Sequence, residues 1–128
     1  MSVGILLVTH GSTAESLVEE AAFVLGQPLE RVFAMEFMHS TNATRIDDIL
    51  SRIRQADDGD GVLVLTDLMG ASPANMVSEA LEQCHAVMVT GVNLAMLIRA
   101  FNYRDQTLEL VVQKAVDGGK SAVRIFQK

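Results

Sequence analysis

The residues of this chain best suited to chemistry are His10, Asp67 and Ser72, and each lies at or just after the end of an apolar run. An imidazole is a nucleophile at neutral pH, and a carboxylate that binds one ring nitrogen leaves the other free to react. A hydroxyl beside a helix N-terminus, with its unpaired N–H groups and partial positive charge, suits an anion. These residue types predict a site that accepts and passes on a phosphoryl group.

The two stretches that carry these residues, 5–12 and 62–73, have the same organisation. Each is an apolar run that ends in Thr and a functional side chain, then turns through Gly and small polar residues into a helical pattern. A short apolar run without alternation is typical of a strand buried on both faces of a parallel sheet. Ligands bind such sheets at the carboxyl ends of the strands. We therefore expect His10 and Asp67 to meet at one edge.

The rest of the chain alternates strand and helix patterns. Strands are expected over 3–9, 32–37, 62–66 and 85–90, each followed by a helix, and a further helix over 107–116 stops at Gly118-Gly119 before a closing strand over 122–126. This predicts an α/β fold with three layers, α/β/α. The sheet is mostly parallel with strand order 2-1-3-4, plus an appended antiparallel C-terminal strand. The switch point then falls between the strands that carry His10 and Asp67.

Local signals predict where individual elements begin and end. Ser12 followed by Glu15 is a capping-box pattern for the first helix, and Gly26 is expected to end it. Pro73 suits the first turn of the third helix. The run 57–61, rich in Asp and Gly, has too few spaced oxygen ligands for a metal loop and predicts a solvated turn.

Composition limits the class of protein. The chain has 128 residues, 49% of them apolar and 20% charged, which predicts a single compact domain over 1–128. The net charge of −6 without a Lys/Arg cluster excludes nucleic-acid binding. No apolar run has the length of a bilayer, no leader precedes the first strand, and the single Cys84 forms no internal disulfide. We expect a cytoplasmic protein with no metal and no cofactor.

Three blocks then identify a resemblance: residues 7–11 (LVTHG), 65–75 (LTDLMGASPAN) and 90–97 (TGVNLAML). In this order and spacing they resemble the IIA component of the mannose-type (mannose/fructose/sorbose) sugar phosphotransferase system, essentially from end to end. His-Gly alone is a weak signal. The Asp-x-x-Gly-x-Ser-Pro block together with Gly-Val-Asn-x-x-Met-Leu makes it specific.

The resemblance implies a phosphotransferase that works through a phosphohistidine. His10 would take the phosphoryl group from the phosphocarrier HPr and pass it to a IIB domain or protein, peripheral to a IIC/IID permease. Asp67 would hydrogen-bond the imidazole and Ser72 would help to hold the phosphoryl group. Members are typically homodimers that exchange a C-terminal strand, for which Gly118-Gly119 would be a hinge or else a plain loop. A regulatory phosphoryl acceptor, with no sugar transported, stays open as well.

Two positions depart from the pattern of well-studied members. Met69 stands where an aromatic residue is common, and residues 39–41 replace a Pro-Gly type of turn. Both could line the rim where a partner docks. The four methionines near this rim either form an adaptable apolar docking surface or fill the core; they are Met35, Met38, Met69 and Met76.

Two other function classes compete with this interpretation. The opening stretch also resembles small class II chelatases, in which a His in a His-Gly-Ser turn binds the metal inserted into a tetrapyrrole. Such a site needs a second histidine, and His85 is expected at the wrong edge of the sheet. The other alternative is a non-catalytic nucleotide- or flavin-binding module that uses the same crevice. His39 follows the second strand and either lies at the rim of the site or is a solvated loop residue.

Overall fold

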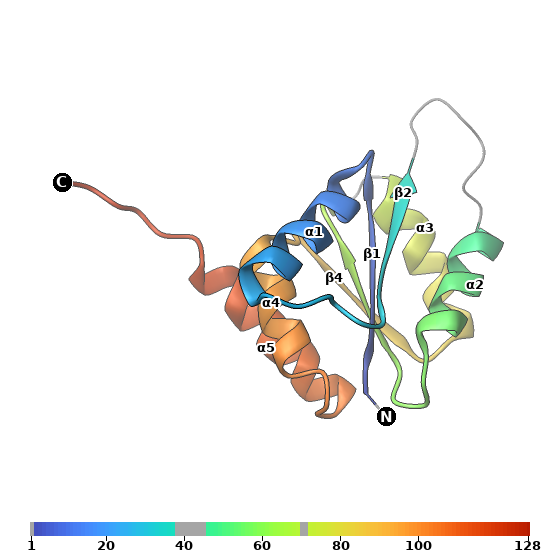
Figure 1. Cartoon of the computed structure of the whole chain (residues 1–128). Coiled ribbons are helices and arrows are strands. Elements are labelled where there is room, and N and C mark those ends of the chain that lie inside the picture. Colours follow the sequence, from blue (N-terminus) through green and yellow to red (C-terminus); the bar gives the residue numbers. More distant parts are fainter. Residues whose placement is uncertain (1, 38–45, 70–71) are drawn as a thin grey trace.

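The computed structural model describes residues 2–37, 46–69 and 72–128, and within them strands and helices alternate along the chain (Figure 1). The expected pattern is confirmed for the parallel strands and for the helices that connect them. In chain order the elements are β1 (Gly4–His10), α1 (Thr13–Leu25), β2 (Val32–Phe37), α2 (Ile46–Ala56), β3 (Val62–Thr66), α3 (Ser72–Ala80), a 3-10 turn η1 (Leu81–Gln83), β4 (Ala86–Thr90), α4 (Leu94–Asn102) and α5 (Leu108–Ser121).

Within the described residues the sheet has four strands in the order β2-β1-β3-β4, as predicted, and all neighbours are parallel. β1 and β3 are the central strands, and Val8 pairs with Thr66 in their register. β1 ends at His10, two residues beyond Val8, and Asp67 is the first residue after β3. Because the chain reverses its direction of winding between β1 and β3, this is the switch point of the sheet.

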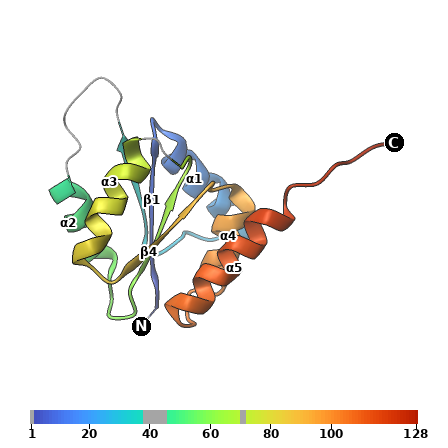
Figure 2. The same cartoon turned by 180° about the vertical axis from the view of Figure 1, so that it is seen from behind.

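Helices cover both faces of the sheet, which gives the predicted three layers (Figures 1 and 2). The strands alternate buried side chains between the two faces. One core lies between the sheet and α1, α4 and α5 and includes Ile5, Leu7, Leu63 and Leu65. The other lies against α2 and α3 and includes Leu6, Val8, Val62 and Val64. β1 and β3 are thus buried on both faces, as their continuous apolar runs predict.

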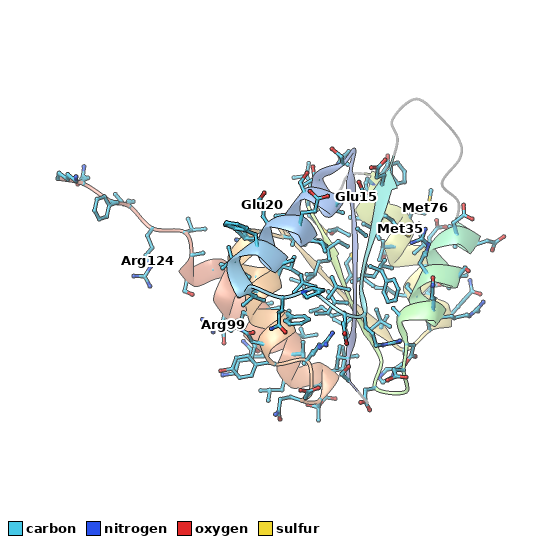
Figure 3. The ribbon with its side chains drawn as sticks, in the orientation of Figure 1. Glu15, Glu20, Met35, Met76, Arg99 and Arg124 are labelled. Carbon is cyan, nitrogen blue, oxygen red and sulfur yellow. The ribbon has the colours of Figure 1, made fainter. Side chains whose placement is uncertain are left out.

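The methionines divide between core and surface. Met35 is buried and Met76 is half-buried, and both pack in the core under α2 and α3 (Figure 3). Met69 is 72% exposed in the turn that follows β3. The core interpretation therefore holds for Met35 and Met76, and a docking role stays a prediction for Met69. Met38 lies outside the described residues.

The two ends of α1 differ in how well local signals predicted them. Gly26 ends the helix in the left-handed conformation at φ 68°, and its N–H donates to the carbonyls of Ala22 and Phe23. The expected capping box at the other end is wrong. Ser12 has φ −94° and ψ 12°, outside the extended region a capping residue needs, and its side chain makes no capping hydrogen bond.

Gly118 and Gly119 do not end the last helix, because α5 continues through them to Ser121. The hinge expected there is also wrong. Both glycines are buried against α4: a Cβ added to Gly118 would lie 2.8 Å from Cβ of Arg99, and one added to Gly119 would lie 2.5 Å from Cε of Met96. The glycines let two helices approach closely, and this packing outweighs their low helix propensity.

Gly118→Ala tests this packing, because a hinge and a packing contact predict opposite results. Ala favours a helix interior by about 1 kcal/mol over Gly. Overpacking against the Arg99 stem, which is fixed close to the backbone, costs about 1–3 kcal/mol. We expect a net loss of stability, measured as a lower melting temperature. Lys120→Ala, at an exposed position of α5, is the control and should change little. A melting temperature raised by Gly118→Ala would contradict the packing role.

The C-terminal segment, residues 123–128, forms no strand in the single chain, so the strand expected over 122–126 stays a prediction that a second chain would have to complete. The segment runs away from the body of the molecule (Figure 1). Its apolar side chains are in solvent: Val123 is 80% exposed, Ile125 92% and Phe126 85%. Arg124, labelled on this segment in Figure 3, donates from Nε to the carbonyl of Ser121 at 2.9 Å. A strand needs a neighbour to pair with, and none of the described strands pairs with this segment.

Candidate functional site

His10 and Asp67 meet at the carboxyl edge of the central strands, as expected. The Nδ1 atom of His10 lies 2.9 Å from Oδ2 of Asp67. The backbone N–H of His10 donates to the same oxygen at 3.1 Å. One carboxylate oxygen therefore binds both the backbone and the ring of the same histidine, which fixes the direction of the imidazole. Gly11 follows with φ 50°, a conformation that Gly adopts without strain, and turns the chain toward α1.

This pairing decides which ring nitrogen can react. An ionised carboxylate only accepts hydrogen bonds, so Nδ1 of His10 must carry the proton, and in the neutral ring Nε2 then carries the lone pair. The two side chains are 29% and 22% exposed, which leaves the imidazole within reach of a large donor. The arrangement can therefore serve nucleophilic chemistry at Nε2.

The electrostatics of the pair favour an ionised carboxylate. Burial raises the pKa of the Asp67 carboxyl, but the hydrogen bonds from the ring and the backbone of His10 lower it by more. The net pKa therefore lies below the usual 3.8. A pKa that is lower in the folded state stabilises the fold above the unfolded value, and this contribution is lost as the pH falls through the folded value.

Asp67→Asn is therefore expected to flatten the acid limb of the stability curve. The free energy of unfolding of the wild type should fall more steeply than that of the variant as the pH drops from about 5 through the lowered pKa. Chemical unfolding at a series of pH values measures this. The effect is small because the pair is partly exposed. Parallel curves for the two proteins would show that the carboxylate is not linked to folding.

Ser72 is the first residue of α3, and its side chain is exposed at the start of that helix. Pro73 follows at a position where its missing N–H costs nothing, as predicted. The helix thus begins shortly after Asp67, on the same edge of the sheet as His10. A direct role for Ser72 in holding a phosphoryl group stays a prediction, and Gly70 and Ala71 lie outside the described residues.

His85 lies at the other end of the sheet. It directly precedes β4, whereas His10 ends β1, and all the strands run in the same direction. At about 3.3 Å per strand residue, their levels differ by roughly 20 Å. His85 instead borders a groove of about 510 Å³ with Asp60, Asp105 and Glu109. The two histidines are not brought together, and His39 lies outside the described residues.

Two features of the site region had no assigned role in the sequence. Asn93 caps α4 by accepting from the N–H of Met96 at 2.9 Å, and its amide also donates to the carbonyl of Gly119 on α5 at 3.1 Å. Thr9 and Thr66 are completely buried at the ends of β1 and β3. A polar residue inside an otherwise apolar strand is the signal that could have marked the two threonines.

Two kinds of feature are absent from the described residues. No group of three or more His, Cys, Asp or Glu side chains is placed to hold a metal ion. No helix there combines the length and the apolar character needed to cross a membrane.

The fold and the site together define a doubly wound α/β protein with a histidine–carboxylate pair at its switch point. Residues 4–116 match the family model EIIA-man, described as the PTS system fructose IIA component. The chain is 33% identical over 131 residues to the PTS system mannose-specific EIIAB component of Escherichia coli. That alignment covers 99% of this chain and 40% of the relative. The chain therefore belongs to the EIIA-man family of the phosphotransferase system.

Two further matches describe the range of relatives. The mannose/sorbose specific IIA subunit of the phosphotransferase system from Enterococcus faecalis superposes with a TM-score of 0.87 at 23% identity, covering 100% of this chain and 97% of that one. The Transcriptional regulatory protein LevR of Bacillus subtilis is 29% identical over 118 residues, which are 87% of this chain and 12% of that protein. The chain thus spans less than half the length of these two sequence relatives from Escherichia coli and Bacillus subtilis.

Proposed function

We propose that this chain is a cytoplasmic phosphoryl carrier of the sugar phosphotransferase system. His10 accepts a phosphoryl group from phospho-HPr and passes it to a IIB domain or protein. The observation that carries the proposal is the contact of 2.9 Å between Nδ1 of His10 and Oδ2 of Asp67 at the switch point of the sheet. Membership of the EIIA-man family supports the same chemistry.

The proposed transfer is a displacement at phosphorus. The lone pair on Nε2 of His10 attacks the phosphorus, a new N–P bond forms, and the bond from phosphorus to HPr breaks with its electron pair leaving on HPr. The ring gains positive charge as this happens. The Asp67 carboxylate, bound to Nδ1–H, stabilises that charge and needs no rearrangement to do so. Transfer to IIB is the same displacement with the phosphoryl group leaving His10.

The phosphoryl oxygens need their own partners at this edge. The N-terminus of α3 carries the partial positive charge of a helix start, and Ser72 adds an exposed hydroxyl there. α1 begins at Thr13, directly after the turn that follows His10, and adds a second helix N-terminus. We assign Ser72 and these two helix starts to holding the transferred group.

The partner that receives the phosphoryl group distinguishes two roles for the same chemistry. The mannose-specific relative from Escherichia coli is by name an EIIAB component, which favours transfer to IIB and a place beside a IIC/IID permease. The relative LevR is by name a transcriptional regulator, which favours a regulatory phosphoryl acceptor instead. We give preference to IIB transfer because that relative matches 99% of this chain.

The experiment that tests the function is direct phosphorylation. Incubation with phosphoenolpyruvate, enzyme I and HPr is expected to add one phosphate per chain, labile in acid and stable in base as a phosphorus–nitrogen bond is. Omission of HPr is the control. A chain that stays unlabelled with active enzyme I and HPr would refute the proposal. Adding a purified IIB protein should then remove the label, and retention with every IIB tested would favour the regulatory role.

The chelatase alternative depends on a metal held by two histidines. His10 and His85 lie at opposite ends of the sheet, so they do not form that site together. No specific observation favours a nucleotide- or flavin-binding module, and that alternative stays a prediction that absorption spectra of the purified protein would test.

The proposed active form is a homodimer in which the C-terminal segments are exchanged. β4 is an edge strand, and a groove of about 570 Å³ runs beside it, lined in part by Met88, Val89, Val112 and Val116. Open sheet edges and exposed apolar segments favour pairing with a second chain. In a strand over residues 123–127, Val123 and Ile125 would lie on one face and Phe126 on the other.

Charge also supports this exchange. Residues 118–128 carry three basic and no acidic side chains, whereas the chain as a whole has a net charge of −6. A segment of opposite charge to the body is attracted to a second copy of that body. Addition of residues 123–127 to the β4 edge of the partner would bury the apolar side chains that are exposed in the single chain.

A further inference from the structure

Three oxygen atoms at the ends of the central strands are buried without a hydrogen-bond partner among the described residues. They are Oγ1 of Thr9, Oγ1 of Thr66 and Oδ1 of Asp67. Both threonines are 0% exposed in strands whose other side chains are mostly apolar. Burying an unpaired hydroxyl costs free energy, and buried polar groups are nearly always paired in folded proteins. A valine would fill either position without that cost.

Thr9 and Asp67 are neighbours on one face of the sheet. Ile5 and Leu7 of β1 pack in the core under α1, α4 and α5, and since side chains alternate, Thr9 follows them on that face. Leu63 and Leu65 of β3 pack in the same core, so position 67 continues their face. The pairing of β1 with β3 brings Thr9 level with Asp67, one residue beyond the pair of Val8 and Thr66.

The carboxylate is held against this end of β1. Its Oδ2 accepts a hydrogen bond from the backbone N–H of His10 at 3.1 Å, and His10 directly follows Thr9 in the chain. Oδ2 also takes the ring nitrogen of His10, so the second oxygen is the one that still requires a donor. The Thr9 hydroxyl is a buried donor on that face, and it too has no hydrogen-bond partner among the described residues.

We propose that Thr9 is a positioning residue that acts on His10 through Asp67. Its hydroxyl donates a hydrogen bond to Oδ1, directly after rotation about its Cα–Cβ bond or through one buried water. This second anchor keeps the carboxylate ionised and its plane fixed. The Nδ1–H group of His10 then keeps its hydrogen bond to Oδ2, and Nε2 keeps its lone pair. Hydrogen-bond partners fix the tautomer of metal-binding histidines in the same way. The proposal rests on the proposed function of His10.

Thr66 provides a matched control. Its side chain is as buried as that of Thr9, its hydroxyl also has no hydrogen-bond partner among the described residues, and it lies one residue before Asp67. Val62 and Val64 pack in the opposite core, so Thr66 follows them toward α2 and α3, away from the Asp67 face. Thr9→Val and Thr66→Val make the same chemical change at two equally buried positions. They differ only in the face of the sheet from which the hydroxyl is removed.

The experiment compares Thr9→Val, Thr9→Ser and Thr66→Val with the wild type. The fraction of His10 with its proton on Nδ1 is read from the nitrogen NMR shifts of the imidazole in the unphosphorylated protein. The rate of phosphoryl transfer from HPr is measured separately. We expect Thr9→Val to lower the Nδ1–H fraction and to slow transfer by about tenfold, the usual scale for one hydrogen bond to a charged group. Thr9→Ser should restore both, and Thr66→Val should leave both unchanged.

Two results would overturn the proposal: Thr9→Val without a change in the Nδ1–H fraction, or Thr66→Val with an equal change. Should Thr9→Val fail to fold, the comparison of Thr9→Ser with Thr9→Ala decides the same question. The NMR measurement needs no phosphoryl donor. A changed Nδ1–H fraction in a protein that HPr does not phosphorylate would therefore leave the Thr9 role standing while refuting the proposed function.

Discussion

His10→Ala is expected to abolish phosphorylation of the chain by HPr. The proposed reaction has one nucleophile, Nε2 of His10, and alanine offers no atom that could replace it. The side chain is 29% exposed and lies at a strand end, so its removal leaves both cores intact. The variant should keep its circular dichroism spectrum and its melting temperature close to that of the wild type. The measurement is incorporation of labelled phosphate per chain in the presence of phosphoenolpyruvate, enzyme I and HPr.

His85→Ala is the matched control, because His85 is also an exposed histidine beside a strand but lies at the opposite edge of the sheet. It should be labelled to the same extent as the wild type. Label that persists in His10→Ala would assign the phosphoryl group to another residue and refute the site. Loss of label in both variants would point to an indirect effect on docking of HPr.

Removal of residues 123–128 is expected to convert a dimer into a monomer. In the single chain Ile125 and Phe126 are almost fully in solvent, and burying either side chain is worth about 2–3 kcal/mol. An exchanged dimer buries each of them twice, so losing them should raise the dissociation constant by at least about a thousandfold. Light scattering after size exclusion distinguishes a particle of the 13.9 kDa chain from one of twice that mass.

Point variants separate the apolar contribution from the length of the segment. Ile125→Asp should weaken the dimer nearly as much as the truncation, while Lys128→Asp makes a larger change in charge at the end of the chain and should leave it assembled. A wild type that is monomeric at high concentration would contradict the exchange. Equal dissociation in both variants would assign the association to charge instead.

Much of the scaffold followed from local patterns in the sequence. The continuous apolar runs of β1 and β3 predicted strands buried on both faces, and both cores confirm this. Parallel strands separated by helices then restrict the topology, because each crossover must be right-handed and pack on the sheet. The order 2-1-3-4 placed His10 beside Asp67 before any coordinates were known, and the contact at 2.9 Å agrees with it.

The failures share a physical cause. Gly118-Gly119 is a helix stop by intrinsic propensity, yet the contact with Arg99 and Met96 keeps both residues in α5. Ser12 and Glu15 form a capping box by spacing, but Ser12 lacks the dihedral angles of a capping residue. The turn before it is held by distant residues, because the N–H of His10 donates to Asp67 and the N–H of Gly11 donates to the carbonyl of Phe37. In both cases a neighbour distant in sequence overrides a local preference, and a local pattern carries no information about that neighbour.

By itself, the sequence determined the fold class, the strand order and the pair of residues expected at the switch point, because hydrophobic periodicity and the rules of βαβ winding act along the chain. Only the tertiary structure decided how Asp67 uses its two oxygens, why α5 contains two glycines, and that residues 123–128 pair with none of the described strands. These depend on distances between elements that are far apart in sequence. Such distances are set by side-chain packing across the whole domain.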